Sequence, residues 1–365
     1  MYDYIVVGAG FAGSVIAERL ASQLNKKVLV VDKRNHIGGN AYDFYDENGI
    51  LIHKYGPHIF HTNSEKVFNY LSNFTEWNYY EHRVLASVDG KLIPMPINRL
   101  TVNSIFGLSL SNDEVEDFFS KIKINIDKIE NSKDIIVSKI GIELYEKIFK
   151  GYTKKQWDLY PEELNPSVCA RIPIRFNDDD RYFSDKYQVM PKHGYSKMFE
   201  SLLSHPNISI LLKEDYKKII NDIKFNKLIY TGPIDDFFDL SYGKLPYRSL
   251  KFKFENYKKE IYQPVATINY PNSYDFTRVT EFKHLTNQTA ESTTIVREYS
   301  SSIGDPYYPI PREENDELYS KYKELSLKLK SVHFIGRLAT YKYYNMDQVV
   351  AQALTLFEKI AKGDF

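Results

Sequence analysis

Cysteine is almost absent from this chain of 365 residues, which contains only Cys169. A single thiol cannot form an intramolecular disulfide, a CxxC redox pair or a metal site with several thiolates, so disulfide reductases are excluded and a reducing, cytoplasmic location is expected. Long apolar runs are also missing, because none approaches the roughly 18 residues that a membrane span needs. Residues 1–4 carry no basic segment and lead into an apolar run, so we expect no signal peptide.

An excess of positive charge is missing too, because 48 basic side chains balance 48 acidic ones. Proteins that bind nucleic acid usually carry such an excess, so that class is disfavoured. Hydrophobic residues make up 43% of the chain, enough for a buried core, and the length predicts two or three domains. Tyrosine is abundant, with 30 residues. These tyrosines either fill the core or line a pocket with hydroxyls for a polar ligand.

The first 32 residues have the pattern of a strand, a helix and a second strand. Similar α/β segments recur near 194–232 and 332–361, while helical and alternating patterns lie between them. We therefore predict an α/β protein in which a discontinuous Rossmann-like domain carries two inserted domains. The predicted boundaries are 1–80, 194–240 and 320–365 for the Rossmann-like domain, 95–165 for a helical domain, and 81–94, 166–193 and 241–319 for an antiparallel sheet domain that binds the substrate.

Gly8, Gly10 and Gly13 match the GxGxxG motif, and Asp32 ends the second predicted strand. Gly8 permits the tight turn, Gly10 lets the backbone approach a pyrophosphate, and Gly13 lets helix and strand pack closely. The N-terminus of the helix attracts phosphate, and Asp32 would hold the ribose hydroxyls of an adenosine. An α/β turn without a ligand is the alternative, which this complete context disfavours.

The pair Gly38-Gly39 favours FAD over NAD, because a second glycine pair after the adenosine-binding acid is typical of flavoproteins. Arg34 either neutralises phosphate or is a solvated surface charge. The strand, turn and helix over 332–361, with Arg337 in the turn, either direct a helix N-terminus at the flavin or form an ordinary last βα unit. Periodicity does not separate these two alternatives.

Longer blocks of the sequence form a recognisable series over nearly the whole chain, at 35–42, 55–62, 150–157, 171–176, 230–235, 247–252 and 336–349. These blocks and their order resemble the prokaryotic UDP-galactopyranose mutase family. The resemblance implies a three-part fold, a homodimer and the interconversion of UDP-galactopyranose and UDP-galactofuranose, which supplies galactofuranose for cell-surface glycans. It also implies covalent catalysis through N5 of reduced FAD, without net oxidation, after an external reductant has reduced the flavin. Such chemistry needs neither a Ser-His-Asp arrangement nor a metal site, and the sequence offers neither.

The resemblance assigns the site residues by matching motifs. Arg175 and Arg278 correspond to two catalytic arginines that flank the diphosphate, which suits bidentate guanidinium groups. Tyr152 corresponds to a residue that stacks on uracil. The implied substrate residues are Phe149, Tyr152, Thr153, Trp157, Arg175, Tyr182, Asn269, Arg278, Tyr307 (or its neighbour Tyr308) and Tyr343. The implied FAD residues are Gly8, Gly10, Phe11, Ala12, Gly13, Asp32, Lys33, Gly38, Gly39, Asn40, His58, Ile59, Arg337, Tyr343, Asn345, Met346 and Val349.

One position departs from the family, which often has aspartate where this chain has Asn345. Asparagine keeps hydrogen bonding but removes a negative charge near the flavin and the sugar. Two other classes remain open. An FAD-dependent oxidase or desaturase of the amine-oxidase class would consume an oxidant in step with product, and a flavin-binding structural or sensor protein would have no use for two arginines that face a diphosphate.

Overall fold

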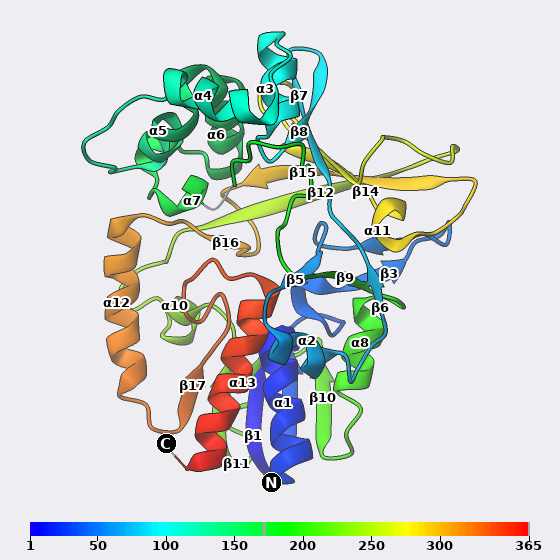
Figure 1. Cartoon of the computed structure of the whole chain (residues 1–365). Coiled ribbons are helices and arrows are strands. Elements are labelled where there is room, and N and C mark those ends of the chain that lie inside the picture. Colours follow the sequence, from blue (N-terminus) through cyan, green and yellow to red (C-terminus); the bar gives the residue numbers. More distant parts are fainter. Residues whose placement is uncertain (171–172, 364–365) are drawn as a thin grey trace. The chain divides into compact units, whose positions relative to one another are not determined.

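The computed structural model describes residues 1–170 and 173–363. The chain forms two compact units, each discontinuous in sequence (Figure 1). Unit 1 comprises Met1–Tyr80, Asp185–Pro246 and Glu317–Phe365, and unit 2 comprises Glu81–Ser184 and Tyr247–Asp316. The predicted fold class, a Rossmann-like α/β domain with a separate antiparallel sheet, is confirmed. The three-part division with its own helical domain stays a prediction, and the first two residues of the 171–176 block lie outside the described residues.

Unit 1 is built on a five-stranded parallel sheet with the order β10-β2-β1-β11-β17. Its strands are β1 (Tyr2–Val7), β2 (Val28–Asp32), β10 (Ile208–Leu212), β11 (Phe225–Tyr230) and β17 (Val332–Phe334). The central strand β1 is apolar on both faces, because helices or loops cover a parallel sheet on both sides. Ile5 and Val6, which point to opposite faces, are both fully buried.

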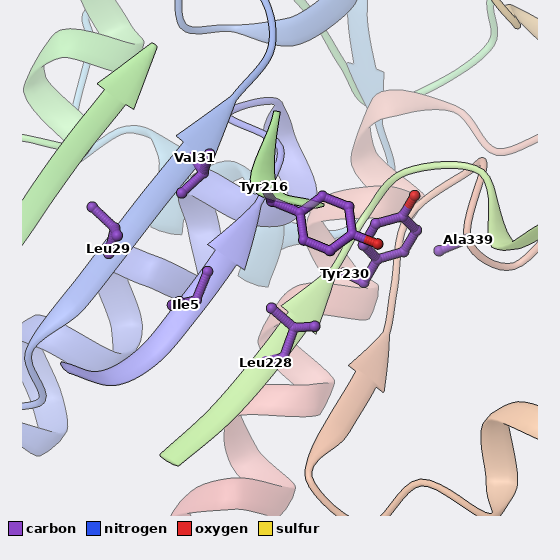
Figure 2. Close-up of a cluster of buried hydrophobic side chains, with 7 residues drawn as sticks. All are labelled: Ile5, Leu29, Val31, Tyr216, Leu228, Tyr230 and Ala339. Carbon is purple, nitrogen blue, oxygen red and sulfur yellow. The ribbon is translucent and has the colours of Figure 1, made fainter. Parts of the chain in front are cut away.

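The two faces of this sheet are covered differently. On one face, α1 (Phe11–Leu24) and α13 (Met346–Lys362) lie side by side (Figure 1). A Cβ atom on Gly13 of α1 would lie 3.1 Å from Val6 Cγ1, which shows how closely this helix approaches the sheet. The other face carries an apolar cluster of residues from three strands, helix α9 (Tyr216–Ile219) and one loop (Figure 2). Its buried members are Ile5, Leu29, Val31, Tyr216, Leu228, Tyr230 and Ala339.

The remaining elements of unit 1 are short. Strand β9 pairs with β5 and β6 in a three-stranded antiparallel sheet, and β3 pairs with β4. Helix α12 (Glu313–Leu327) begins in unit 2 and continues in unit 1. The others are η1 (Gly39–Ala41), β3 (Asp43–Tyr45), β4 (Leu51–His53), β5 (Phe60–Thr62), α2 (Glu65–Leu71), β6 (Trp77–Tyr79), β9 (Tyr187–Pro191), α8 (Tyr195–Leu202), α9 (Tyr216–Ile219) and α10 (Ile234–Phe237).

Unit 2 contains a seven-stranded sheet with the order β16-β12-β15-β14-β13-β7-β8. All neighbours in it are antiparallel except β13 and β7, which are parallel. Strands β7 and β8 form a hairpin whose turn residues, Asp89 and Gly90, both have positive φ, as a tight hairpin turn requires. The strands are β7 (Val84–Val88), β8 (Lys91–Met95), β12 (Tyr247–Tyr257), β13 (Thr267–Asn269), β14 (Arg278–Glu281), β15 (Thr293–Ser301) and β16 (Tyr308–Pro309).

The helices of unit 2 come mostly from residues 99–170. Asn98, Ser111 and Asn131 begin three of them with reciprocal capping boxes. Segment η2 is a π-helix that runs directly into α6, and such segments often occur at functional sites. The elements are α3 (Arg99–Phe106), α4 (Asn112–Ile122), α5 (Ser132–Leu144), η2 (Tyr145–Lys150), α6 (Gly151–Trp157), η3 (Pro161–Glu163), α7 (Ser167–Ala170) and α11 (Lys283–Thr286). None of the helices in the described ranges combines the length and apolar character needed to cross a bilayer.

Candidate active site

The turn between β1 and α1 brings backbone atoms so close together that side chains cannot be accommodated. Gly8 has a φ of +104°, and a Cβ atom there would lie 2.1 Å from Thr231 Oγ1. A Cβ atom on Gly13 would lie 1.9 Å from the carbonyl oxygen of Gly8. Helix α1 starts at Phe11 without a side-chain cap on its N-terminus. The N–H groups of its first turn therefore remain for an anionic ligand.

The second glycine pair completes this cradle. Gly38 N–H donates to Ala9 O at 2.8 Å, which joins the two loops. Gly39 has a φ of +57°, and a Cβ atom there would lie 2.9 Å from Gly10 Cα. A side chain at Gly39 would therefore push the two loops apart. The backbone donors and the lack of side chains fit the diphosphate of a dinucleotide cofactor.

Asp32 is fixed at the edge of this cradle. Ala9 N–H donates to its Oδ2 at 2.8 Å and Arg34 N–H donates to its Oδ1 at 2.9 Å. Each carboxylate oxygen keeps a second lone pair, as a pair of ribose hydroxyls requires. Arg34 is held over the Tyr55 ring at 4.4 Å and donates to Asn40 Oδ1 at 2.9 Å, whereas Lys33 is exposed.

His58 and Ile59 follow β4 in a loop that two histidines organise. His58 N–H donates to Nδ1 of His53 at 3.0 Å, and His58 Nδ1 lies 2.9 Å from Gly56 O. Burial lowers the pKa of His53 to about 3, so this ring stays neutral and accepts the hydrogen bond. The backbone of His58 is therefore fixed without any charge on His53, and Ile59 is buried beside it.

The turn after β17 brings a second helix N-terminus into unit 1. Gly336 has a φ of +90°, and a Cβ atom there would lie 3.1 Å from the Cβ of Ala12 in α1. Asn345 caps α13, whose first residue is Met346, and Asn345 N–H donates to Gln348 Oε1 at 2.9 Å. Val349 lies in the first turn of this helix. Arg337 donates to Tyr344 O at 3.1 Å, with its guanidinium 5.2 Å from the Tyr343 ring.

Unit 2 contains a row of three polar side chains, Asn269, Arg278 and Glu298, which we call the polar row. Arg278 pairs with Asn269 on one side and with Glu298 on the other, and directly paired residues point to the same face of an antiparallel sheet. Arg278 Nε lies 2.8 Å from Glu298 Oε1, and Glu298 is fully buried. Burial disfavours the charged guanidinium, but the carboxylate of Glu298 outweighs this and raises the pKa of Arg278.

The polar row contains buried atoms with unused hydrogen-bonding capacity. Within the described part of the chain, no hydrogen-bond partner is found for Asn269 Oδ1, for Arg278 Nε or for either carboxylate oxygen of Glu298. Arg278 and Glu298 nevertheless form an ion pair, in which Nε and Oε1 lie 2.8 Å apart. Because buried polar atoms are nearly always paired in native proteins, with protein groups, water or a ligand, such a group has room for a further polar partner.

Aromatic residues gather near the arginine of the polar row. Tyr152 and Tyr308 are close enough to interact electrostatically with Arg278. The ring centroids of Trp157 and Tyr308 lie 6.2 Å apart. Tyr307 is buried, with its ring 5.8 Å from that of Phe252. The choice between Tyr307 and Tyr308 as the substrate residue stays a prediction.

Other predicted substrate residues make different contacts. Phe149 and Thr153 are buried in η2 and α6. Tyr182 N–H donates to His82 O at 2.7 Å. Arg175 Nη1 donates to Asp179 O at 3.0 Å, while its Nη2 is buried and has no hydrogen-bond partner among the described residues. All predicted substrate residues except Tyr343 belong to unit 2, and all predicted cofactor residues belong to unit 1.

Comparison with known proteins decides the family. The sequence pattern of the UDP-galactopyranose mutase family matches residues 147–343, and that of NAD(P)-binding Rossmann-like domains matches residues 6–74. A probable UDP-galactopyranose mutase from Klebsiella pneumoniae is 41% identical over 359 residues, which cover 96% of this chain and 93% of the relative. The chain belongs to the UDP-galactopyranose mutase family. It is therefore an isomerase, and the resemblance seen in the sequence is confirmed.

The relatives of this UDP-galactopyranose mutase family chain are named for different sugar nucleotides. A dTDP-fucopyranose mutase from Escherichia coli is 36% identical over the full length of both chains. A crystal structure of reduced UDP-galactopyranose mutase shares the fold with a TM-score of 0.81 at 16% identity, covering 99% of this chain and 96% of that one. A putrescine oxidase bound to putrescine shares the fold more distantly, with a TM-score of 0.61 at 14% identity and 99% coverage of both chains.

Two residues of this mutase-family chain were missed by sequence reasoning. Glu298 lies on the same face of β15 as the buried Thr294 and Val296, because the three residues are spaced by two. This spacing could have indicated a buried acid on the strand. Lys155 stands beside Lys154 in the sequence, and nothing in that pattern tells which of the two lysines packs against a distant loop.

Proposed function

We propose that the chain interconverts UDP-galactopyranose and UDP-galactofuranose, with reduced FAD as cofactor, and so supplies galactofuranose for cell-surface glycans. The observation that carries this proposal is the polar row, which has a half-buried arginine paired with a fully buried carboxylate, next to tyrosines. A cation at this position suits the diphosphate of a sugar nucleotide. The assignment of individual residues follows from their motifs and their contacts.

The glycine cradle and the first turn of α1 would hold the FAD diphosphate, Asp32 the adenosine ribose, and the N-terminus of α13 the flavin. When bound in its reduced form, FAD supplies a nucleophilic N5 atom for the anomeric carbon, with no net oxidation of the sugar. Close backbone approach at Gly39 and Gly10 supports this assignment, because it brings the two glycine loops together beside the first turn of α1.

The substrate residues would bind and orient the nucleotide. Because Nε of Arg278 faces Glu298, its terminal nitrogens remain for two oxygens of the diphosphate. A fixed cation there stabilises the charge that develops on the UDP leaving group, and the loss of one such donor lowers a rate about 100-fold or more. Arg175 would supply the second cation. Tyr152 would stack on uracil, with Trp157 beside it.

The test is ring interconversion by the purified flavoprotein. UDP-galactofuranose is incubated with dithionite-reduced enzyme and with oxidised enzyme, and products are separated by anion-exchange chromatography while oxygen uptake is followed. We expect UDP-galactopyranose from reduced enzyme alone, without oxygen uptake in step with product. Consumption of oxygen in step with product would support the amine-oxidase alternative. Flavin-loaded protein without turnover would support a binding role.

dTDP-fucopyranose is the second candidate substrate, because the relative named for it matches over the full length of both chains. Fucose lacks the 6-hydroxyl of galactose, and thymine carries a methyl group that uracil lacks. The same enzyme preparation should be assayed for kcat/KM with both substrates. A value at least about tenfold higher for UDP-galactose, equal to ~1.4 kcal/mol of transition-state binding, supports the first proposal. The reverse ratio assigns the chain to dTDP-fucose.

A further inference from the structure

The loop between β13 and β14, residues 270–277, closes around the side chain of Lys155. The ammonium group, Nζ, donates to four backbone carbonyl oxygens of this loop, which we call the carbonyl cage. The oxygens are those of Tyr270, of Ser273 at 3.0 Å, of Tyr274 at 3.3 Å and of Phe276 at 3.1 Å. An ammonium has three N–H bonds, so four carbonyl dipoles satisfy it completely. Without the cation, the converging oxygens would repel one another.

Further contacts hold the same loop against the helical segment. Asn272 Nδ2 donates to Lys147 O in η2 at 2.8 Å. A Cβ atom on Gly151, at the start of α6, would lie 2.5 Å from Asn272 Oδ1 and 2.6 Å from Pro271 O. The loop therefore meets η2 and α6 at backbone distance, and Lys155 contributes the charged part of this contact.

The loop and the helix carry separate parts of the proposed nucleotide site. Asn269 directly precedes the loop and Arg278 directly follows it, so both ends of the loop lead into the polar row. Tyr270 N–H donates to Thr277 O at 2.9 Å, which closes the loop at its base. On α6, Tyr152 lies one turn before Lys155 and acts electrostatically on Arg278. A shift of the loop relative to α6 would change the separation of Tyr152 from Arg278.

The position of the ammonium is costly, which argues against a passive side chain. Burial lowers the pKa of Lys155 to about 8, and the charge of Asp275 opposes this effect. By contrast, the adjacent Lys154 reaches outward to Asp158, with Nζ 2.7 Å from the carbonyl oxygen and 3.4 Å from Oδ1. Two neighbouring lysines of one helix thus have different surroundings, and only Lys155 faces the loop.

We propose that Lys155 is a positioning residue for the sugar nucleotide: its ammonium holds loop 270–277 on α6 and thereby fixes the distance between Tyr152 and Arg278. The identity of the ligand rests on the proposed function, whereas the effect on the loop does not. Lys155 acts through the loop and through Arg278, and it takes no part in bond making.

The test compares Lys155→Met with Lys154→Met in the oxidised, FAD-loaded enzyme. Methionine keeps an apolar stem and removes the donors. We expect Lys155→Met to weaken UDP binding at least about tenfold by calorimetry, or ~1.4 kcal/mol, and to speed amide hydrogen exchange of residues 270–277 by about tenfold or more. Lys154→Met should stay within about twofold of the parent in both, as expected of an exposed lysine. FAD content should not change in either variant.

Chemical rescue separates the charge from general packing. In Lys155→Cys, alkylation with 2-bromoethylamine restores an ammonium of nearly native length, and the native Cys169 is buried. Rescue is shown by UDP affinity within about threefold of the parent, against about tenfold weaker binding before alkylation. If Lys155→Met folds poorly, the uncharged Lys155→Gln replaces it in the comparison.

The outcomes are distinct. UDP affinity in Lys155→Met equal to that in Lys154→Met would overturn the proposal, even if loop exchange were faster. Complete alkylation of the thiol introduced by Lys155→Cys without regain of affinity would overturn it as well. A parent enzyme that does not bind UDP at all would overturn the proposed function, and loop exchange would still report whether Lys155 holds residues 270–277.

Discussion

Replacing Arg278 with methionine probes the energetics of the polar row. Glu298 is fully buried, its Oε1 lies 2.8 Å from Arg278 Nε, and neither of its carboxylate oxygens has a hydrogen-bond partner among the described residues. The variant leaves this carboxylate buried without its counter-charge. Removing one partner of a buried ion pair costs about 3–5 kcal/mol, so we expect the free energy of unfolding of Arg278→Met to fall by about that amount.

The double variant Arg278→Met/Glu298→Met serves as the control. It removes both charges, and replacing a whole buried pair with apolar groups is often neutral, so most of the lost stability should return. Turnover should be lost in both variants, because both lack the cation for the diphosphate. The loss of such a cation lowers the rate about 100-fold or more. Urea unfolding followed by circular dichroism gives the stabilities, and flavin absorbance verifies that FAD stays bound.

Two results would refute this reasoning. If Arg278→Met were as stable as the parent, Glu298 would not depend on Arg278 for charge compensation. If the double variant were less stable than Arg278→Met, the buried carboxylate would not be the source of the loss. Near-normal turnover in either variant would remove Arg278 from the active site.

Three further predictions concern other parts of the molecule. Gly39→Ala should weaken FAD binding at least about tenfold, measured by flavin absorbance after dialysis, since its Cβ would lie 2.9 Å from Gly10 Cα. The hydrogen bond between His284 and Glu281 raises the pKa of His284, and burial opposes this effect. The protonated His284 therefore stabilises the fold fully below about pH 6.5, and this stabilisation is lost as the pH rises through the raised pKa. His284→Gln should therefore lower the free energy of unfolding by about 1 kcal/mol more at about pH 5.5 than at about pH 8.5, and equal losses at both would contradict this. Asn345→Asp should lower the flavin midpoint potential by about 10–30 mV in spectroelectrochemistry, because a negative charge opposes anionic reduced flavin, and an unchanged potential would exclude this effect.

The Rossmann-like part was predictable because its signals are local. Apolar residues at 5–7 and 28–31, the glycines of the turn and Asp32 lie within 32 consecutive residues and specify strand, turn, helix and strand in order. The same holds for the hairpin of β7 and β8, whose turn is Asp89-Gly90. In each case the residues that carry the pattern also contact one another in the fold.

The polar row was only partly predictable, because it depends on which strands pair and in which register. Motif matching supplied Asn269 and Arg278, but Glu298 lies 20 residues after Arg278 and is brought to it by the pairing of β14 with β15. The alternation along β15 predicts which face of the strand Glu298 lies on, but not which residue lies opposite it on the neighbouring strand. The contacts of Lys155 could not be predicted for a similar reason. Its partners are backbone carbonyl oxygens, and every residue type has one.

The three-segment construction of unit 1 has a consequence for synthesis on the ribosome. β17 completes the parallel sheet and α13 lies against α1, yet both emerge long after β1. At about 5–20 residues per second, roughly 15–65 s separate translation of β1 from that of β17. Both segments of unit 2 are translated within that interval. A nascent chain stalled before Val332 should therefore carry no yellow colour, and flavin loading is expected to follow translation.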